Sequence, residues 1–287
     1  MDTVLQGRSK TVVIGSDKPF CIIGERINPT GRKKFAEELR GGDLSTVVVD
    51  TEAQMAAGAD VLDINAGIPL VDEAELLATM LQTVQAEADI PICIDSSVIE
   101  ALEAGLAVYE GKPLVNSVTG EDERLEEILP LVARHGAAVI GLANDETGIP
   151  ETPQQRLEIA TKIVSAAGDH GIPPEDVVID PLAMTVGADT EAVTTTLETI
   201  RLIRDTLGVN MCLGASNVSF GLPERHVLNA AFLPMAMAAG LTSAIMSTAK
   251  VCVDEVRAAD LLLGHDPWGS RWIATHRARK AEALAAS

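Results

Sequence analysis

Polar side chains that could bind a ligand recur along this chain, each directly after a short apolar run rich in β-branched residues. Single aspartates in such places are usually helix N-caps, but here the pattern repeats after seven successive runs. The residues concerned are Glu25, Arg26, Asn28, Asp63, Asn65, Asp95, Ser96, Ser97, Asn116, Ser117, Asn144, Asp145, Asp180, Ser216 and Asn217.

Brought together, these side chains would form a surface rich in hydrogen-bond acceptors and amide donors and poor in cations. Such a surface suits a neutral heterocycle with guanidine-like N–H donors and ring acceptors. A phosphate would instead require glycine-rich turns with Lys or Arg. No Cys-x-x-Cys pair occurs and the five histidines lack metal-ligand spacing, so we expect no protein-bound metal.

Eight apolar runs, spaced by about 20 to 40 residues and each followed by an amphipathic segment, must position these side chains. This alternation predicts an α/β fold: an eight-fold parallel β/α (TIM) barrel whose strand ends meet at one open mouth. A doubly wound open sheet is the alternative, but its Gly-x-Gly-x-x-Gly turn is missing. The predicted strands are residues 20–23, 61–64, 92–94, 114–115, 138–142, 177–179, 211–213 and 244–246.

We expect residues 1–287 to form one domain, with a hairpin segment at residues 1–19 and a helical tail at residues 268–287. Residues 11–14 and 20–23 flank a turn and are predicted to pair as a hairpin that plugs the bottom of the barrel. The apolar stretch 230–246 contains Pro234 and Gly240, which favours a helix followed by a buried strand over a membrane span.

The composition narrows the class of protein. A net charge of -20 without a Lys/Arg stripe argues against a nucleic-acid partner. The four cysteines lie far apart in the sequence and are predicted to be buried, reduced thiols. The first ten residues lack an apolar stretch of signal-peptide length, so we expect a cytoplasmic protein that does not enter a membrane.

Six ordered motifs carry a family resemblance: residues 24–31 (GERINPTG), 62–67 (LDINAG), 93–97 (CIDSS), 115–117 (VNS), 179–182 (IDPL) and 216–219 (SNVS). Together they resemble the methyltetrahydrofolate:corrinoid methyltransferases, a family that includes the pterin-binding module of cobalamin-dependent methionine synthase. The loops at residues 184–187 and 220–225 differ from the family's versions.

The resemblance implies that the mouth binds tetrahydrofolate or methyltetrahydrofolate, with Asp95, Asn116, Asp180 and Asn217 holding the pterin. Supporting positions would be Glu25, Asp63, Asn65 and Ser96. The resemblance also assigns Asn217 to the pterin N5, the atom that carries the methyl group, as the catalytic residue. A tertiary amine leaves poorly unless N5 gains a proton or a strengthening hydrogen bond, so no protein nucleophile is needed.

The methyl group would be exchanged with the cobalt of a corrinoid, either free cobalamin or a corrinoid protein, and the resemblance implies a homodimer. The direction of transfer and the choice between tetrahydrofolate and tetrahydromethanopterin stay open. Asp63 and Asn65 could instead bridge neighbouring strand ends, and Glu25 could form an internal ion pair with Arg26.

Two other functions compete with methyl transfer. The first is a dihydropteroate synthase-like pterin transferase, which the Arg and Lys residues at 32–34 keep open although the motif at residues 24–28 argues against it. The second is a folate-binding module without catalytic activity. Turnover with methylcobalamin and tetrahydrofolate separates an enzyme from such a module.

Overall fold

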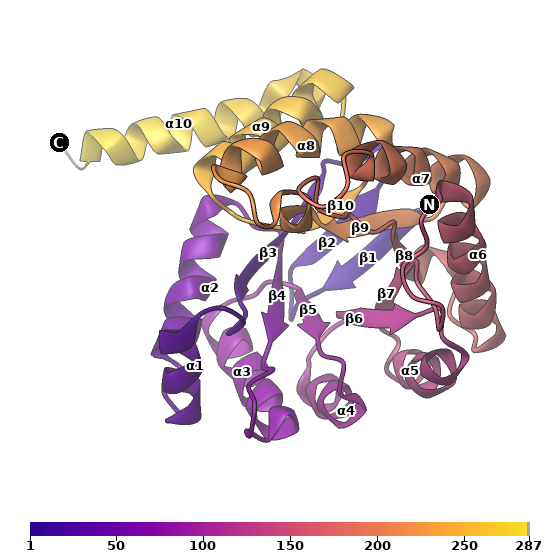
Figure 1. The fold of residues 1–287 in the computed structure, drawn as a ribbon. Helices are drawn as coiled ribbons and strands as arrows, with labels where there is room; N and C mark the ends of the chain where they lie inside the picture. The colour runs from indigo at the N-terminus through magenta and orange to yellow at the C-terminus, as the bar shows by residue number, and fades with distance from the viewer. Residues whose placement is uncertain (286–287) are drawn as a thin grey trace.

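The eight predicted runs are strands that pair in parallel and close into a barrel in the computed structural model, which describes residues 1–285. The order around the barrel is β10, β3, β4, β5, β6, β7, β8 and β9 (Figure 1). The predicted TIM barrel is therefore confirmed. Its strands are β3 (Cys21–Ile27), β4 (Val61–Asn65), β5 (Ile92–Asp95), β6 (Leu114–Thr119), β7 (Ala138–Leu142), β8 (Val177–Asp180), β9 (Asn210–Gly214) and β10 (Ser243–Met246).

Helices between the strands surround the barrel (Figure 1). Several of their ends carry the expected signals: Asp72 accepts from the backbone N–H of Glu75 at 3.1 Å, and Gly58 ends a helix with φ 105°. No helix in residues 1–285 is both long and apolar enough to cross a membrane. The helices are α1 (Lys33–Arg40), α2 (Ser45–Ala57), α3 (Glu73–Glu87), α4 (Ile99–Val108), α5 (Asp122–His135), α6 (Pro153–Asp169), α7 (Ala192–Thr206), α8 (Arg225–Ala239) and α9 (Lys250–Leu263).

Alternation along each strand separates two apolar clusters. Residues such as Ile22, Leu62 and Ile94 belong to the larger one, which also contains the buried faces of the helices. Their neighbours in sequence belong to a smaller cluster, which lies inside the barrel. Because side chains alternate with period two, the next inward position after Cys93 is Asp95, and the next after Val178 is Asp180. The members of the interior cluster are Leu5, Ile14, Cys21, Ile23, Val61, Cys93, Leu114, Ala138, Ile140, Val178 and Cys212.

A hairpin closes the bottom of the barrel, but its strands are not the predicted ones. β1 (Asp2–Gln6) pairs antiparallel with β2 (Thr11–Gly15), and their side chains Leu5 and Ile14 join the interior cluster. The predicted partner, residues 20–23, instead starts the first barrel strand, because it is apolar on both faces and pairs in parallel with β10 and β4. The predicted pairing of residues 11–14 with residues 20–23 was therefore wrong.

The C-terminal segment forms α10 (Ser270–Ala285), a helix that extends away from the barrel (Figure 1). A short 3-10 turn (Pro267–Gly269) separates it from α9. Asp266 fastens the start of the helix by accepting hydrogen bonds from the backbone N–H groups of Arg271 and Trp272 at 3.0 and 2.9 Å. This helix lies within the segment predicted as a helical tail, residues 268–287.

Buried Asn210 at the start of β9 attaches the plug to the barrel, because its amide donates to Thr3 Oγ1 and the Ile14 carbonyl, both at 2.9 Å. We expect Asn210→Ala to lower the free energy of unfolding by about 1 to 3 kcal/mol, since it leaves a buried carbonyl unpaired. Chemical denaturation measures the loss. Asp17→Ala, in the exposed turn after β2, should change stability by less than about 0.5 kcal/mol. Equal effects of the two variants would contradict this role of Asn210.

Candidate functional site

A pocket of about 640 Å³ occupies the mouth of the barrel, where the carboxyl ends of the strands meet. All four residues predicted to hold the ligand line it, together with two of the four predicted supporting residues. Strand ends supply part of the lining, and the loops after β3, β9 and β10 together with α2 and α8 supply the rest. The predicted residues in the pocket are Glu25, Asp63, Asp95, Asn116, Asp180 and Asn217.

The floor of the pocket is formed by Asp63, Asp95 and Asn116, and the register of their strands brings these residues together. Asn65, Asp95 and Asn116 are paired positions on three adjacent strands. The Asn65 amide donates to Asp95 Oδ2 at 3.0 Å, and the Asn116 amide donates to Asp63 Oδ1 at 3.3 Å. Asn65 therefore bridges neighbouring strand ends, as its structural interpretation predicted, and orients Asp95. Asp63 of β4 accepts from Asn116 of β6 across the intervening strand and also lines the pocket.

Ser96 lies outside the pocket and serves the loop after β5. Its hydroxyl donates to Glu73 and accepts from the backbone N–H of Val98 at 3.0 Å. The hydroxyl thereby ties the start of α3 to the turn that follows Asp95. Ser96 does not line the pocket, so its position agrees with a supporting role and not with direct contact to a ligand.

Burial disfavours the charged form of every carboxyl group on the floor. It raises the pKa of Asp95 to about 6, although the hydrogen bond from Asn65 opposes the shift. Burial and the nearby charge of Asp95 raise the pKa of Asp63 well above its ordinary range. Burial also raises the pKa of Glu25, although Ser216 donates a hydrogen bond to it.

Asp180 lies across the mouth, at the end of β8. One of its oxygens accepts the backbone N–H of Leu182 at 2.7 Å, which fixes the carboxyl group. Buried Arg156 holds the same loop by donating to the carbonyls of Pro181 and Leu182 at 3.0 and 2.8 Å. Burial raises the pKa of Asp180 to about 7 despite these neighbours, so the carboxylate is poised to gain from N–H donors of a ligand.

Asn217 projects from a 3-10 turn (Ala215–Ser219) that follows β9. Its side-chain amide lines the pocket and has no hydrogen-bond partner among the side chains that the structure describes. Gly214, just before the turn, leaves the space that this amide occupies, since a Cβ there would lie 2.9 Å from Asn217 Nδ2. The amide is thus free for a ligand, and a side chain at position 214 would displace it.

Hydrogen bonds around Ser216 hold that turn in place. The Ser216 hydroxyl donates to Glu25 Oε1 at 2.9 Å, and Asn229 of α8 donates to Ser216 Oγ at 3.3 Å. Glu25 therefore connects the first strand to the turn carrying Asn217. The predicted ion pair between Glu25 and Arg26 is not formed: Arg26 is paired with Asp50 at 4.0 Å instead.

Sequence reasoning missed Gln54 of α2, which also lines the pocket. Its Oε1 accepts the backbone N–H of Arg26 at 2.9 Å, which leaves its buried Nε2 without a partner among the described residues. Gly24 makes room for it, because a Cβ at this position would collide with the Gln54 amide. A single glutamine within a helix gives no sequence signal of this role.

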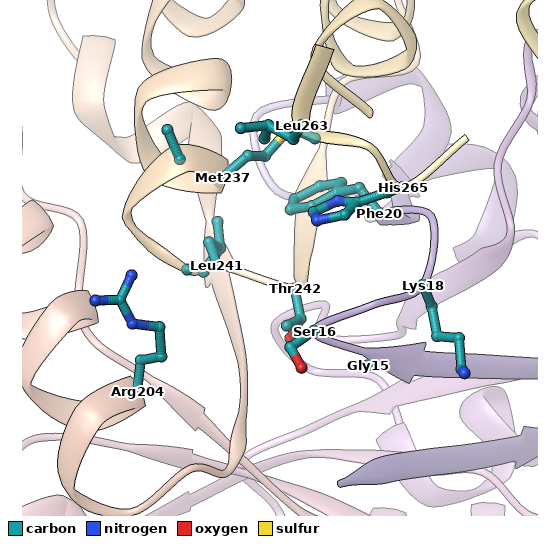
Figure 2. A pocket seen from close by; sticks show the side chains of 12 residues that line it. Gly15, Ser16, Lys18, Phe20, Arg204, Met237, Leu241, Thr242, Leu263 and His265 are labelled. Carbon is teal, nitrogen blue, oxygen red and sulfur yellow. The ribbon is translucent and has the colours of Figure 1, made fainter. Parts of the chain in front are cut away.

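A second cavity, of about 220 Å³, lies at the opposite end of the barrel, beside the starts of β3 and β10 (Figure 2). Its polar side chains are engaged elsewhere: Thr242 exchanges hydrogen bonds with the backbone of Met211, and Arg204 donates to the Ala239 carbonyl at 2.8 Å. No carboxylates converge there among the residues that line it. The mouth is therefore the candidate site.

Comparison with known proteins agrees with this geometry. The family model described as pterin binding enzyme matches residues 24–247. Methylcorrinoid:tetrahydrofolate methyltransferase of Eubacterium limosum is 32% identical over 254 residues, covering 86% of this chain and 92% of that protein. Methionine synthase of Mycobacterium tuberculosis is 34% identical over 256 residues, covering 84% of this chain but 21% of that much longer protein.

Solved structures with the same fold include the dihydropteroate synthase of Xanthomonas albilineans with 4-aminobenzoic acid, at a TM-score of 0.69 and 18% identity. That match covers 91% of this chain and 98% of the other. The Yersinia pestis DHPS with a pterine-sulfa conjugate has a TM-score of 0.68 and 14% identity, over 91% of this chain and 99% of the other. At sequence identities of 14 to 18%, the similarity shows a shared fold and does not extend to function.

The resemblance drawn from the six motifs is thus confirmed by matches that run through all of them. The chain belongs to the pterin-binding enzymes, in the group that contains methylcorrinoid:tetrahydrofolate methyltransferase and the matching segment of methionine synthase.

Proposed function

We propose that this protein transfers a methyl group between N5 of tetrahydrofolate and the cobalt of a corrinoid. One observation carries the proposal: a mouth lined by half-buried Asp95, Asn116 and Asp180 also presents the unpaired amide of Asn217. The similarity to methylcorrinoid:tetrahydrofolate methyltransferase, over 92% of that protein, supports the same reaction.

The floor carboxylates are proposed to hold the pyrimidine end of the pterin. That end carries an amino group and ring N–H groups, which donate to carboxylates in charge-assisted hydrogen bonds about twice as strong as neutral ones. Asp95 and Asp180 face the pocket from well-separated strands, so they would hold the ring from two sides. Asn116 adds an amide that can both donate and accept.

Asn217 is proposed to act at N5. When the methyl group leaves methyltetrahydrofolate for Co(I), the electron pair of the N5–carbon bond stays on nitrogen, which must gain a proton. An amide that hydrogen-bonds N5 more strongly in the transition state than in the ground state lowers the barrier. In reverse, the N5 lone pair attacks the methyl group of methylcob(III)alamin, N5 loses its proton, and cobalt keeps the bonding electrons as Co(I).

The corrinoid is proposed to approach over the open mouth, either as free cobalamin or on a partner protein. The homodimer implied by the family resemblance stays a prediction. Arg32, which kept a dihydropteroate synthase-like reaction open, donates to Asp50 at 2.6 Å and to the Arg26 carbonyl at 2.6 Å. Because its guanidinium is already paired with Asp50, Arg32 is less available to bind a pyrophosphate.

Anaerobic mixing of the protein with methylcobalamin and tetrahydrofolate tests the proposed reaction directly. We expect the visible spectrum to lose the methyl–cobalt form and gain Co(I) only when protein and tetrahydrofolate are both present. Calorimetry with tetrahydrofolate, run in parallel, separates the outcomes. Binding without turnover, even with added corrinoid protein, would favour a folate-binding module; absence of binding would reject the pterin site itself.

Asp180 should make pterin affinity depend on pH. Its raised pKa of about 7 means that it is protonated below neutrality, where a ligand N–H must first displace that proton. Tetrahydrofolate affinity should therefore fall by up to about tenfold per pH unit below pH 7 and level off above it. Calorimetry between about pH 6 and 8 measures the profile.

Asp180→Asn is the matched variant for this profile. It should weaken binding at high pH by about 1.5 to 3 kcal/mol, the value of a hydrogen bond to a charged group, and flatten the dependence near pH 7. A variant that keeps the wild-type slope would show that another group titrates.

Asn217→Ala should slow methyl transfer more than it weakens tetrahydrofolate binding, because its hydrogen bond is proposed to strengthen in the transition state. Gly214→Ala should have the same signature, since the added methyl group displaces the amide without removing it. Single-turnover rates and calorimetric affinities provide the two readouts. Equal losses of binding and of rate would restrict Asn217 to substrate binding.

A further inference from the structure

Arg156 is a buried cation next to the site, and it has no carboxylate in contact with it. This residue of α6 is 3% exposed, and a buried charge is costly unless an opposite charge or hydrogen bonds compensate it. No carboxylate among the residues that the structure describes lies within 4.0 Å of its guanidinium. The guanidinium donates to the backbone carbonyls of Pro150 at 3.0 Å, Pro181 at 3.0 Å and Leu182 at 2.8 Å. The anion that balances Arg156 therefore acts from beyond contact distance.

A single peptide group connects Arg156 to Asp180. The Pro181 carbonyl, which accepts from Arg156, belongs to the same peptide unit as the Leu182 N–H, which donates to Asp180 Oδ1 at 2.7 Å. The dipole of this peptide thus has its oxygen end at the cation and its hydrogen end at the carboxylate. Hydrogen bonds in such a chain polarise one another, so the charge on Arg156 strengthens the bond that Asp180 accepts.

Further contacts fix the turn that carries this peptide group. Leu182 has a φ of 64°, in the left-handed region that a leucine occupies only where its surroundings hold it. Its carbonyl accepts from Arg156 and also from Thr196 Oγ1 of α7 at 3.0 Å. Groups on two helices therefore hold the Leu182 N–H toward Asp180.

The ionisation of the two side chains agrees with this connection. Burial raises the pKa of Asp180 to about 7, and the backbone N–H groups of Leu182 and Gly214 and the charge of Arg156 oppose the rise. Burial lowers the pKa of Arg156, and the charge of Asp180 opposes that change. Each charge thus stabilises the other, although the two side chains form no direct ion pair.

The elements packed against Asp180 bring few other ionisable groups. Strand β7 has none, and β9 contributes Cys212, whose pKa is raised by burial and by the charge of Asp180. The remaining charged side chains of α6 and α7 are exposed apart from Lys162, which pairs with Asp122 at 2.7 Å. Across the pocket lie the carboxyl groups of Glu25, Asp63 and Asp95 and the basic groups of Arg26, Arg32, Arg225 and His226. Of these described groups, Arg156 is the one that reaches Asp180 through a hydrogen-bonded peptide.

We propose that Arg156 is a positioning residue: it stabilises the carboxylate form of Asp180 through the Pro181–Leu182 peptide and keeps that carboxylate available to the N–H donors of the pterin. The role toward the pterin rests on the proposed function, whereas the coupling between Arg156 and Asp180 does not. The pH range in which the site binds its substrate is then set by a residue of α6 that does not line the pocket.

Arg156→Gln tests the coupling, because it removes the charge and keeps an amide that can donate. A carbon-13 NMR titration of the Asp180 carboxyl group in the ligand-free protein, assigned by its absence from Asp180→Asn, measures the midpoint. We expect the midpoint to rise by about one pH unit, since the carboxylate form loses its cation. Tetrahydrofolate affinity, measured by calorimetry, should then fall about fivefold at about pH 7 and less than about twofold at about pH 9, where Asp180 is ionised in both proteins.

Thr196→Val is the matched control. It removes another hydrogen bond to the Leu182 carbonyl, at 3.0 Å, but no charge. Its midpoint should stay within about 0.3 pH units of the wild type, and any loss of affinity should be the same at every pH. Arg156→Lys, which keeps the charge, should restore most of the wild-type midpoint.

An unchanged midpoint in Arg156→Gln, or an equal rise in Thr196→Val, overturns the coupling and leaves Arg156 with a structural role. If Arg156→Gln does not fold, the wild type decides: the Arg156 Nε–H signal should titrate with the midpoint of Asp180, and a signal that stays constant over that pH range overturns the proposal. Failure of tetrahydrofolate to bind the wild type rejects the proposed function instead, and the carbon-13 titration still decides the coupling.

Discussion

Inside the barrel, the inward-facing side chains change from apolar to acidic over a single step of two residues, and the rest of the site depends on that boundary. Below it, Cys93 and Val178 belong to an interior cluster sealed by the hairpin. Above it, Asp95 and Asp180 line the mouth with no Lys or Arg in ion-pair contact among the described residues. A carboxylate in this position is costly unless it is protonated or accepts hydrogen bonds. The raised pKa values follow from this cost, and a ligand with N–H donors relieves it.

The surroundings hold these groups rigidly. Asn65 orients Asp95, the backbone of Leu182 orients Asp180, and Glu25 and Asn229 hold the turn that carries Asn217 through Ser216. A site whose groups are fixed by their own hydrogen bonds pays little to reorganise when the ligand binds. The Asn217 amide is the exception, since it has no partner of its own among the side chains that the structure describes, and it is the group proposed to act at N5.

The fold alone does not decide the chemistry. Dihydropteroate synthases share the barrel at 14 to 18% identity, and a common barrel can host different reactions on the loops of its open face. In this chain, Asp63, Asp95, Asn116 and Asp180 line the pocket from the ends of β4, β5, β6 and β8, and Arg26 and Arg225 line it from β3 and α8.

Sequence by itself determined the eight strands, the barrel and the floor of the site. Strands of a parallel barrel are buried on both faces and therefore appear as short apolar runs, and the polar residue that ends each run lies at the mouth for topological reasons. Asp95, Asn116, Asp180 and Asn217 were identified in this way and through the motifs around them.

Only the tertiary structure decided which contacts these residues make. Ser216 and Glu25 are 191 positions apart and meet because β3, β10 and β9 are adjacent in the closed barrel. The same closure gathers Arg26 and Arg225 at one rim, brings Gln54 over Gly24, and pairs β2 with β1 rather than with residues 20–23. Such contacts depend on which strands close the barrel, and no local pattern of residue types records that choice.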